Sequence, residues 1–253
     1  MLMQTNTSPQ LPRKSELVPI NGKNIYYEVY GKGKPLFLLH GYTQSSVSWQ
    51  SYINDYEKEY EVYLVDLTGH GKSDPFQEDL HIRSVAEDLQ ALINYLKLEQ
   101  IKAIGFSFGG DVLYQLALIN PTIIERMITI GAIGTWTILD FPEYLETFTF
   151  ENRNNFPWLK TSHNGEEHIR AIMEQFKNYI VKLSDQELQS IQPEVLIMIG
   201  DDDEGMNLND IVRTRQNLPN SDLWILPNVS HGAHEGENKE EFIKKSKRFL
   251  NKS

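Results

Sequence analysis

The sequence predicts an α/β protein in which helices cover both faces of a mostly parallel, twisted sheet. Short apolar runs of strand length alternate with segments whose apolar residues recur at helical spacing. This alternation is typical of a parallel sheet that is buried on both faces. With 253 residues, 40% hydrophobic and 23% charged, the chain also has the composition of a globular protein.

The first elements predict a β-hairpin. Residues 1–15 are polar and are expected to form a flexible N-terminal tail. Ser15–Ile20 and Asn24–Tyr30 then form two strand-like runs on either side of Asn21-Gly22, a pair that favours a tight hairpin turn. Further strands are expected at Pro35–Leu39, Glu61–Asp66, Ile101–Phe106, Met127–Gly131, Val195–Ile199 and Leu223–Leu226.

Three helices are predicted around these strands. Helical spacing of apolar residues covers Ile82–Leu98, and a second helix follows Phe106 and ends near Asn120, before Pro121. A third helix, Phe242–Leu250, closes the chain. Residues 16–131 and 194–253 are therefore expected to form one core.

The alternation breaks down over residues 132–193, which we expect to form a small helical lid inserted between two sheet strands. A helix is predicted to start at Asn164, with Glu167 completing a capping box. Its apolar face is predicted to hold Ile169, Ile172, Met173, Phe176 and Ile180. Ser184 and Glu187 predict a second capping box.

Composition argues against several classes of protein. The chain has no cysteine, which excludes disulfides and cysteine-held metal centres. Its net charge of −11 disfavours nucleic acid and anionic membranes as partners. No apolar run has the length of a membrane span, and the first residues lack a secretory core. We expect a cytoplasmic protein that is a monomer or weak homodimer.

Gly105-Phe106-Ser107-Phe108-Gly109 lies between a predicted strand and a predicted helix. G-x-S-x-G in this context is typical of a nucleophile elbow, a tight turn that holds serine in a strained backbone conformation. Ser107 would then stand clear of the sheet at a helix N-terminus. The backbone N–H of Phe108 would stabilise developing negative charge there.

Five ordered motifs together resemble the α/β-hydrolase superfamily, specifically its serine esterases with a small lid. Besides the elbow, the chain has a His-Gly loop at Leu38–Tyr42 and a D-x-x-G-x-G-x-S turn at Asp66–Asp74. A strand with an acidic turn at Val195–Asp203 and a late histidine loop at Ser230–Gly232 complete the resemblance. It implies the α/β-hydrolase fold over nearly the whole chain.

The resemblance implies a Ser-Asp-His triad, in this order along the chain. Ser107 would be the nucleophile and His231 the general base. Counting from Gly200 selects Asp203 as the acid, with Asp201 as the main alternative and Asp140 as a further one. The resemblance also implies that the backbone N–H of Tyr42 is the second oxyanion donor.

These residues predict a serine hydrolase that cleaves a small ester through an acyl-enzyme and needs no cofactor or metal. Relatives that open epoxides or remove halides use aspartate at the elbow, so Ser107 disfavours both reactions. Carbon–carbon bond hydrolysis, peracid formation and a ligand-binding signalling role on the same fold remain open. The expected substrate pocket is apolar and includes Phe106, Trp136, Phe141 and Trp158.

Overall fold

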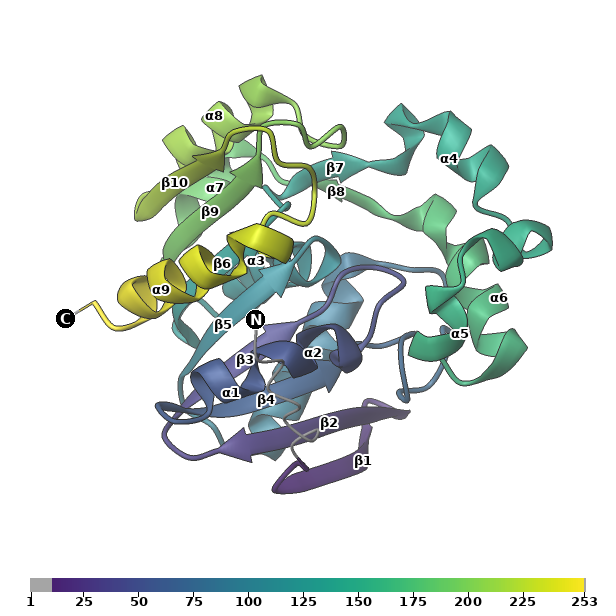
Figure 1. The fold of residues 1–253 in the computed structure, drawn as a ribbon, viewed down its shortest axis with the longest axis horizontal. Helices are drawn as coiled ribbons and strands as arrows, with labels where there is room; N and C mark the ends of the chain where they lie inside the picture. Colours follow the sequence, from purple (N-terminus) through teal and green to yellow (C-terminus); the bar gives the residue numbers. More distant parts are fainter. Residues whose placement is uncertain (1–10, 253) are drawn as a thin grey trace, which may run out of the picture.

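A sheet of eight strands forms the centre of the computed structural model, which describes residues 11–252 (Figure 1). Of the predicted tail, residues 1–10 lie outside the described residues. The strand order is β1-β2-β4-β3-β5-β6-β9-β10. These strands are β1 (Lys14–Ile20), β2 (Lys23–Gly31), β3 (Lys34–Leu39), β4 (Tyr60–Asp66), β5 (Ile101–Phe106), β6 (Ile124–Ile130), β9 (Glu194–Gly200) and β10 (Ser221–Leu226).

The strand pairing confirms the predicted mostly parallel sheet. All neighbours from β4 to β10 in the sheet are parallel, whereas β1–β2 and β2–β4 are antiparallel. The predicted hairpin joins β1 to β2. Its turn residues Asn21 and Gly22 have φ values of 48° and 79°, which match the left-handed conformation that a two-residue hairpin turn requires.

Helices cover both faces of the sheet, as predicted. Apolar residues of α1 (Ile53–Tyr56) and α9 (Lys239–Leu250) pack on one face. On the other face lie α2 (Ile82–Tyr95), α3 (Phe108–Ile119) and α8 (Leu208–Asn217). The central strands β3, β5 and β6 are therefore buried on both sides (Figure 1).

Some boundaries differ from the prediction. Helix α2 ends at Tyr95 instead of Leu98, because Lys97 takes a left-handed φ of 58° that helix cannot continue through. The 3-10 turn η1 (Ser46–Tyr52) and helix α8 were not predicted. Both are short, and α8 carries only two buried residues, Ile211 and Thr214, so its apolar periodicity is weak.

Residues 132–193 connect β6 to β9 and contain more than helices. Two short strands, β7 (Thr135–Thr137) and β8 (Ile180–Lys182), pair antiparallel at the base of this segment. Between them lie η2 (Ile138–Asp140), α4 (Pro142–Thr147), η3 (Phe150–Asn155), α5 (Trp158–Ser162), α6 (Gly165–Gln175) and η4 (Phe176–Asn178), and α7 (Asp185–Ser190) follows β8.

The local predictions in this segment are confirmed in part. Asn164 is the N-cap residue of α6, as predicted, but its side chain makes no capping hydrogen bond. Ile180 does not lie on the α6 face, because the helix ends at Gln175 and Ile180 is 46% exposed in β8. The capping box of Ser184 and Glu187 is confirmed at the start of α7.

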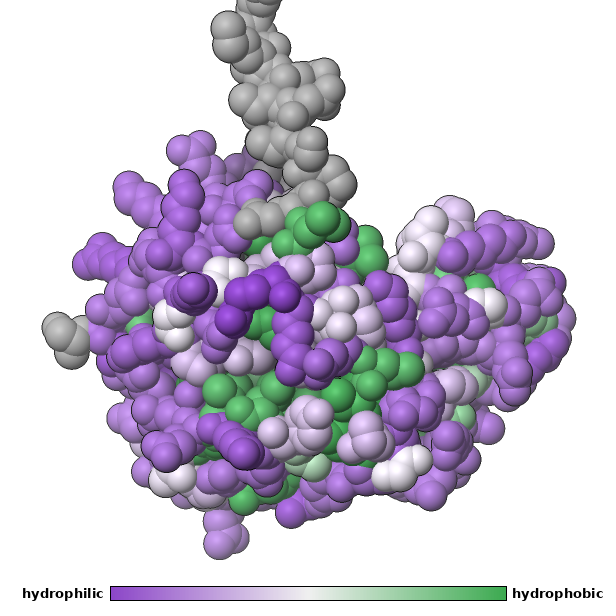
Figure 2. Space-filling model, turned by 90° about the horizontal axis from the view of Figure 1, so that it is seen from below, coloured by the Kyte–Doolittle hydropathy of each residue, from purple (hydrophilic) through white to green (hydrophobic). Residues whose placement is uncertain are grey.

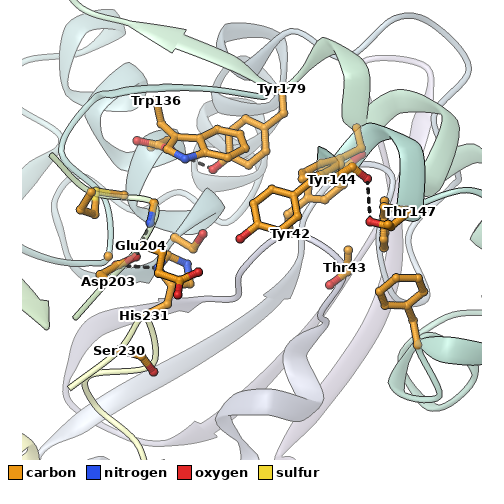
Figure 3. A pocket seen from close by; sticks show the side chains of 18 of the residues that line it. Tyr42, Thr43, Trp136, Tyr144, Thr147, Tyr179, Asp203, Glu204, Ser230 and His231 are labelled. Atoms are coloured by element: carbon orange, nitrogen blue, oxygen red, sulfur yellow. Dashed lines mark hydrogen bonds and ion pairs between the residues drawn. The ribbon is translucent and has the colours of Figure 1, made fainter. Parts of the chain in front are cut away.

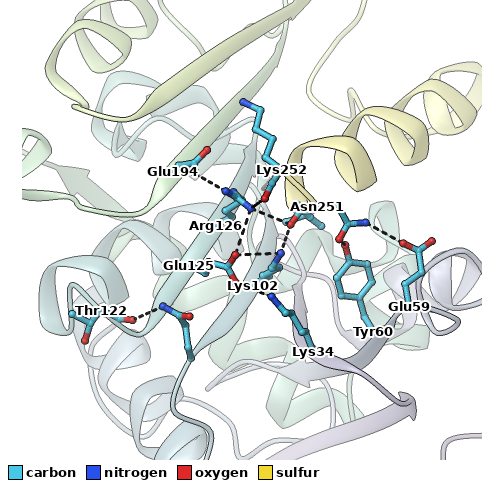
Figure 4. A network of polar contacts seen from close by, with 12 residues as sticks. Lys34, Glu59, Tyr60, Lys102, Thr122, Glu125, Arg126, Glu194, Asn251 and Lys252 are labelled. Carbon is cyan, nitrogen blue, oxygen red and sulfur yellow. Dashed lines mark hydrogen bonds and ion pairs between the residues drawn. The ribbon is translucent and has the colours of Figure 1, made fainter.

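A network of charged groups anchors the C-terminal end of α9 to the sheet (Figure 4). Lys102 of β5 donates to the carbonyl of Leu250, and Arg126 of β6 donates to that of Lys252. Arg126 also pairs with Glu194 at 2.7 Å. On the side of the molecule that lies at the bottom of Figure 1, hydrophilic side chains surround an apolar area (Figure 2).

Candidate active site

Ser107 lies in the turn between β5 and α3, where the elbow motif predicted a strained backbone. Its φ of 48° and ψ of −115° confirm that strain, since φ values in this range are rare outside glycine. The turn is held by the Ser107 N–H, which donates to the carbonyl of Ile130 at 2.7 Å. Helix α3 begins at the next residue, so Ser107 stands at its N-terminus.

Gly105 explains why the motif needs a small residue two positions before the serine. A Cβ atom at Gly105 would lie 2.5 Å from the carbonyl carbon and oxygen of Gly109. This separation is well inside van der Waals contact, so any side chain at position 105 would push α3 away from β5. The glycine thus allows the close approach on which the turn depends.

His231 pairs with Asp203 in the cavity that Ser107 also lines. Nδ1 of His231 lies 2.8 Å from Oδ2 of Asp203. The other carboxylate oxygen of Asp203 accepts the Gly205 N–H at 3.1 Å, and the side chain is 2% exposed. The carboxylate therefore fixes the orientation of the imidazole and occupies Nδ1, which leaves Nε2 available for proton transfer.

The two alternative acids lie elsewhere. Asp201 is exposed and accepts the Val229 N–H, and Asp140 is exposed in η2. In the part of the chain that the structure describes, neither carboxylate bonds to His231. Of the three candidate acids, Asp203 is the one that contacts this histidine.

Ser107, Asp203 and His231 line a cavity of about 440 Å³, part of whose lining is shown in Figure 3. Asp203, Glu204 and His231 gather on one side of it, facing Tyr42 and Tyr144. Eight of the twenty residues that line it are aromatic, and all but one of these rings come from the 132–193 segment. The lining rings are Tyr42, Trp136, Tyr144, Phe148, Phe156, Trp158, Phe176 and Tyr179.

Of the four predicted pocket residues, Trp136 and Trp158 line this cavity. Phe106 does not. Its ring is buried beneath His231, with ring centroids 4.9 Å apart, and also contacts His234. Phe141 stacks on Trp136 at 5.7 Å and is not among the lining residues. Both residues support the site by packing behind other side chains. The sequence pattern does not distinguish such a packing residue from one that lines the cavity.

The two predicted oxyanion donors lie in the loop after β3 and at the start of α3. Tyr42 follows the His40-Gly41 pair after β3, and Phe108 opens α3. Within residues 11–252, the backbone N–H of neither residue has a hydrogen-bond acceptor. His40 supports this loop, because its Nε2 accepts the Leu67 N–H at 3.1 Å.

Asp111 and Tyr179 form a second polar pair in the cavity, which sequence reasoning missed. Asp111 lies one helical turn after Ser107, and its Oδ2 accepts the Tyr179 hydroxyl at 2.8 Å. Burial raises the pKa of Asp111 to about 7, against the stabilising effect of Tyr179 and the Gly134 N–H. Asp111 could have been identified from the sequence, because it is a carboxylate in the otherwise apolar start of α3. No local sequence pattern identifies Tyr179.

Histidines tie the 132–193 segment to the core loops. The Gly71 N–H donates to Nδ1 of His163 at 2.9 Å, and Nε2 of His163 contacts the Thr43 carbonyl at the same distance. The imidazole is therefore neutral, because Nδ1 accepts a hydrogen bond and only Nε2 carries a proton to donate. Burial lowers the pKa of His163 to about 3. His168 adds a 2.8 Å contact to the Gly69 carbonyl.

Across residues 11–252, no three histidine, aspartate or glutamate side chains are grouped so that they could hold a metal ion. The helices of the same range are all too short or too polar to cross a membrane.

Comparison with known proteins gives partial sequence matches. The chain is 32% identical over 114 residues to the soluble epoxide hydrolase of Corynebacterium sp. (strain C12), covering 45% of this chain and 40% of that protein. It is 27% identical over 180 residues to the pimeloyl-[acyl-carrier protein] methyl ester esterase of Aeromonas hydrophila, covering 67% and 69%. The match to the first of these relatives therefore spans well under half of that protein.

Solved structures extend the likeness to nearly the whole chain. Carboxylesterase CesB from Bacillus subtilis superposes with a TM-score of 0.78 over 94% of this chain and 91% of that one, at 21% identity. At this identity the likeness concerns the fold. The sequence model described as "alpha/beta hydrolase fold" matches residues 34–162, about half of the chain. The fold and the family match agree, and the chain belongs to the alpha/beta hydrolase fold family.

Proposed function

We propose that this protein is a serine hydrolase that cleaves small esters, with Ser107 as nucleophile, His231 as general base and Asp203 as the acid that orients it. The observation that carries the proposal is the 2.8 Å contact between His231 and Asp203 beside a strained Ser107 in one cavity. A nucleophile, a base and an orienting acid are the groups that acyl transfer needs.

The reaction follows from these groups. His231 Nε2 takes the Ser107 hydroxyl proton as Oγ forms a bond to the carbonyl carbon, whose oxygen becomes negatively charged. The N–H groups of Tyr42 and Phe108 stabilise that oxygen. When the C–O bond of the ester breaks, the alcohol leaves with the proton from His231. Water then attacks the acyl-enzyme with the same help from His231, and the carboxylic acid is released.

The cavity supports a small apolar substrate. Its volume of about 440 Å³ suits a ligand of modest size, and aromatic rings of the 132–193 segment line the cavity together with Ser107. We propose that this segment acts as a lid that limits the size of the substrate. The serine at position 107 also argues against epoxide opening, in spite of the similarity to an epoxide hydrolase, because that reaction uses an aspartate at the elbow.

A chain-length series of p-nitrophenyl esters tests the proposal. Wild type and Ser107→Ala are compared, with circular dichroism to show that both are folded. We expect turnover that depends on Ser107 and that is fastest for short acyl chains, because aromatic side chains line the cavity and limit its volume to about 440 Å³.

Two results would contradict the proposal. Equal turnover by Ser107→Ala would exclude Ser107 as the nucleophile. Absent turnover by folded wild type would exclude a simple esterase, and vinylogous diketones would then be the substrates to try for carbon–carbon bond hydrolysis.

A further inference from the structure

The turn that contains the proposed oxyanion donor Tyr42 is strained. The carbonyl of Gly41 accepts the Gln44 N–H at 3.1 Å, so Tyr42 and Thr43 are the central residues of a β-turn. Of these two, Thr43 alone has a positive φ, of 67°, which is the pattern of a type II turn. Glycine or asparagine is usual at that position, and a β-branched residue is disfavoured there. Contacts from outside the turn are therefore needed to hold Thr43 in this conformation.

The hydrogen bonds to Thr43 come from the 132–193 segment. Nε2 of His163 donates to the Thr43 carbonyl at 2.9 Å, while Nδ1 of the same ring accepts the Gly71 N–H. Nε1 of Trp158 in α5 donates to Thr43 Oγ1 at 3.2 Å. In the described part of the chain, both hydrogen bonds that Thr43 makes thus lead to this segment. They bind its backbone carbonyl and its side chain at once, which fixes the residue in its strained form.

The same segment also holds Tyr42. The Tyr42 hydroxyl donates to the carbonyl of Ile172 in α6 at 2.7 Å. Its ring packs against Phe176 and Tyr179, with ring centroids 5.2 and 5.4 Å away, and against Phe108 of the core at 5.4 Å. Tyr42 is 8% exposed although it borders the cavity (Figure 3). The turn is therefore clamped between the core and the 132–193 segment.

We propose that the 132–193 segment completes the oxyanion hole, with His163 and Trp158 as positioning residues that keep the Tyr42–Thr43 turn in the form that presents the Tyr42 N–H to the substrate. This inference rests on the proposed function and gives the segment a second role besides limiting substrate size. Without the two hydrogen bonds, the peptide between Tyr42 and Thr43 can flip, because a type I turn relieves the positive φ. The donor N–H next to that peptide then loses its fixed direction, on which an oxyanion hole depends.

Reaction of Ser107 with a fluorophosphonate measures the oxyanion hole without an ester substrate. Oγ forms a bond to phosphorus as fluoride leaves, and the phosphonyl oxygen takes the place of the carbonyl oxygen. His163→Phe keeps a ring at position 163 but removes the donor to Thr43. We expect it to lower the second-order labelling rate about 10- to 100-fold, because a misplaced donor stabilises the oxygen poorly. His163→Gln, whose amide can donate and accept, should label nearly as fast as wild type.

Thr43→Gly separates positioning from general damage. Glycine adopts a positive φ without strain, so the turn no longer depends on the segment. In the Thr43→Gly background, adding His163→Phe should lower the labelling rate by no more than about twofold. Structural damage, such as the Gly71 N–H that His163→Phe leaves unpaired, would not be relieved by glycine at position 43. An equal rate loss in both backgrounds would therefore overturn the proposal.

His168→Phe is the matched control. His168 joins the same segment to the core through a 2.8 Å contact with the Gly69 carbonyl, which lies in the turn after β4. Folded His168→Phe should label at the wild-type rate, and a loss equal to that of His163→Phe would overturn the proposal. If His163→Phe does not fold, Trp158→Phe in the two backgrounds decides, since it removes the bond to Thr43 Oγ1.

Hydrolysis of p-nitrophenyl esters by the same variants distinguishes this inference from the esterase function. Labelling that depends on His163 in a wild type without ester turnover would support the inference and refute only the simple esterase. Ester turnover and labelling that are equally fast in wild type and folded His163→Phe would refute the inference and leave the esterase intact. A wild type that is not labelled at Ser107 would refute both.

Discussion

The neutral histidine that joins the 132–193 segment to the core predicts that acid destabilises the protein. His163 accepts the Gly71 N–H and contacts the Thr43 carbonyl, and burial lowers its pKa from an ordinary 6.5 to about 3. Between these two values the unfolded chain binds a proton at His163 that the folded chain does not bind. The contribution of His163 to stability is therefore complete above pH 6.5 and is lost as the pH falls toward 3.

The size of the loss follows from this linkage. Going from pH 7 to pH 5, protonation of the unfolded chain at this one position lowers the free energy of unfolding by about 2 kcal/mol. His234, which is buried against Trp49 and Phe106, has its pKa lowered by burial to about 3 as well. It should add a loss of similar size.

Urea denaturation at pH 7 and pH 5 measures the effect. In His163→Gln, an amide replaces the ring as acceptor and donor without titrating. The loss between the two pH values should then be about 2 kcal/mol smaller than in wild type. His81→Gln is the control, because His81 is exposed, and it should behave as wild type. An identical loss in His163→Gln and wild type would refute the reasoning.

Three further substitutions have defined outcomes. Asp203→Asn should lower kcat about 10³- to 10⁴-fold in the p-nitrophenyl assay without changing the melting temperature, because the imidazole loses its orienting charge; a small effect would assign the acid elsewhere. Gly105→Ala should cost about 1–3 kcal/mol in urea denaturation, because its Cβ would lie 2.5 Å from Gly109; an unchanged midpoint would show that the elbow tolerates a side chain. Ser184→Ala should cost about 1 kcal/mol through the capping box with Glu187, and equal melting of variant and wild type would contradict this.

Much of the core could be predicted from sequence, because local signals and tertiary structure agree there. The strand before Ser107 is apolar except for Lys102, and glycines lie two positions before and after the serine. Chain geometry and sequence pattern therefore indicate the same turn. The hairpin at Asn21-Gly22 could also be predicted from local sequence, since these two residues favour the turn that connects β1 to β2.

The structure of the 132–193 segment was harder to predict from the sequence, for physical reasons. Its aromatic residues serve two purposes that composition does not distinguish: Trp158 lines the cavity, whereas Phe150 packs in a small separate core with Leu159. Ile180 fits a helical period but lies in β8, because pairing with β7 outweighs local periodicity in so short a strand.

Candidate site residues could be predicted where each lies in a recognisable motif, and they were missed where only folding connects them. Asp203 and His231 were predicted from ordered motifs although they are distant from Ser107 in the sequence. Tyr179 reaches Asp111 from 68 positions away, and no local pattern connects the two. The same is true of His163, whose partners lie in loops before and after β4.

The central claim is that His231 activates Ser107 as a nucleophile. Reaction with a fluorophosphonate, followed by peptide mass spectrometry, tests it most directly because the reagent reports the attacking atom itself. We predict one adduct per chain, located on Ser107, formed rapidly by wild type and far more slowly by folded His231→Ala. Labelling at another residue, or equal labelling rates in wild type and His231→Ala, would contradict the account.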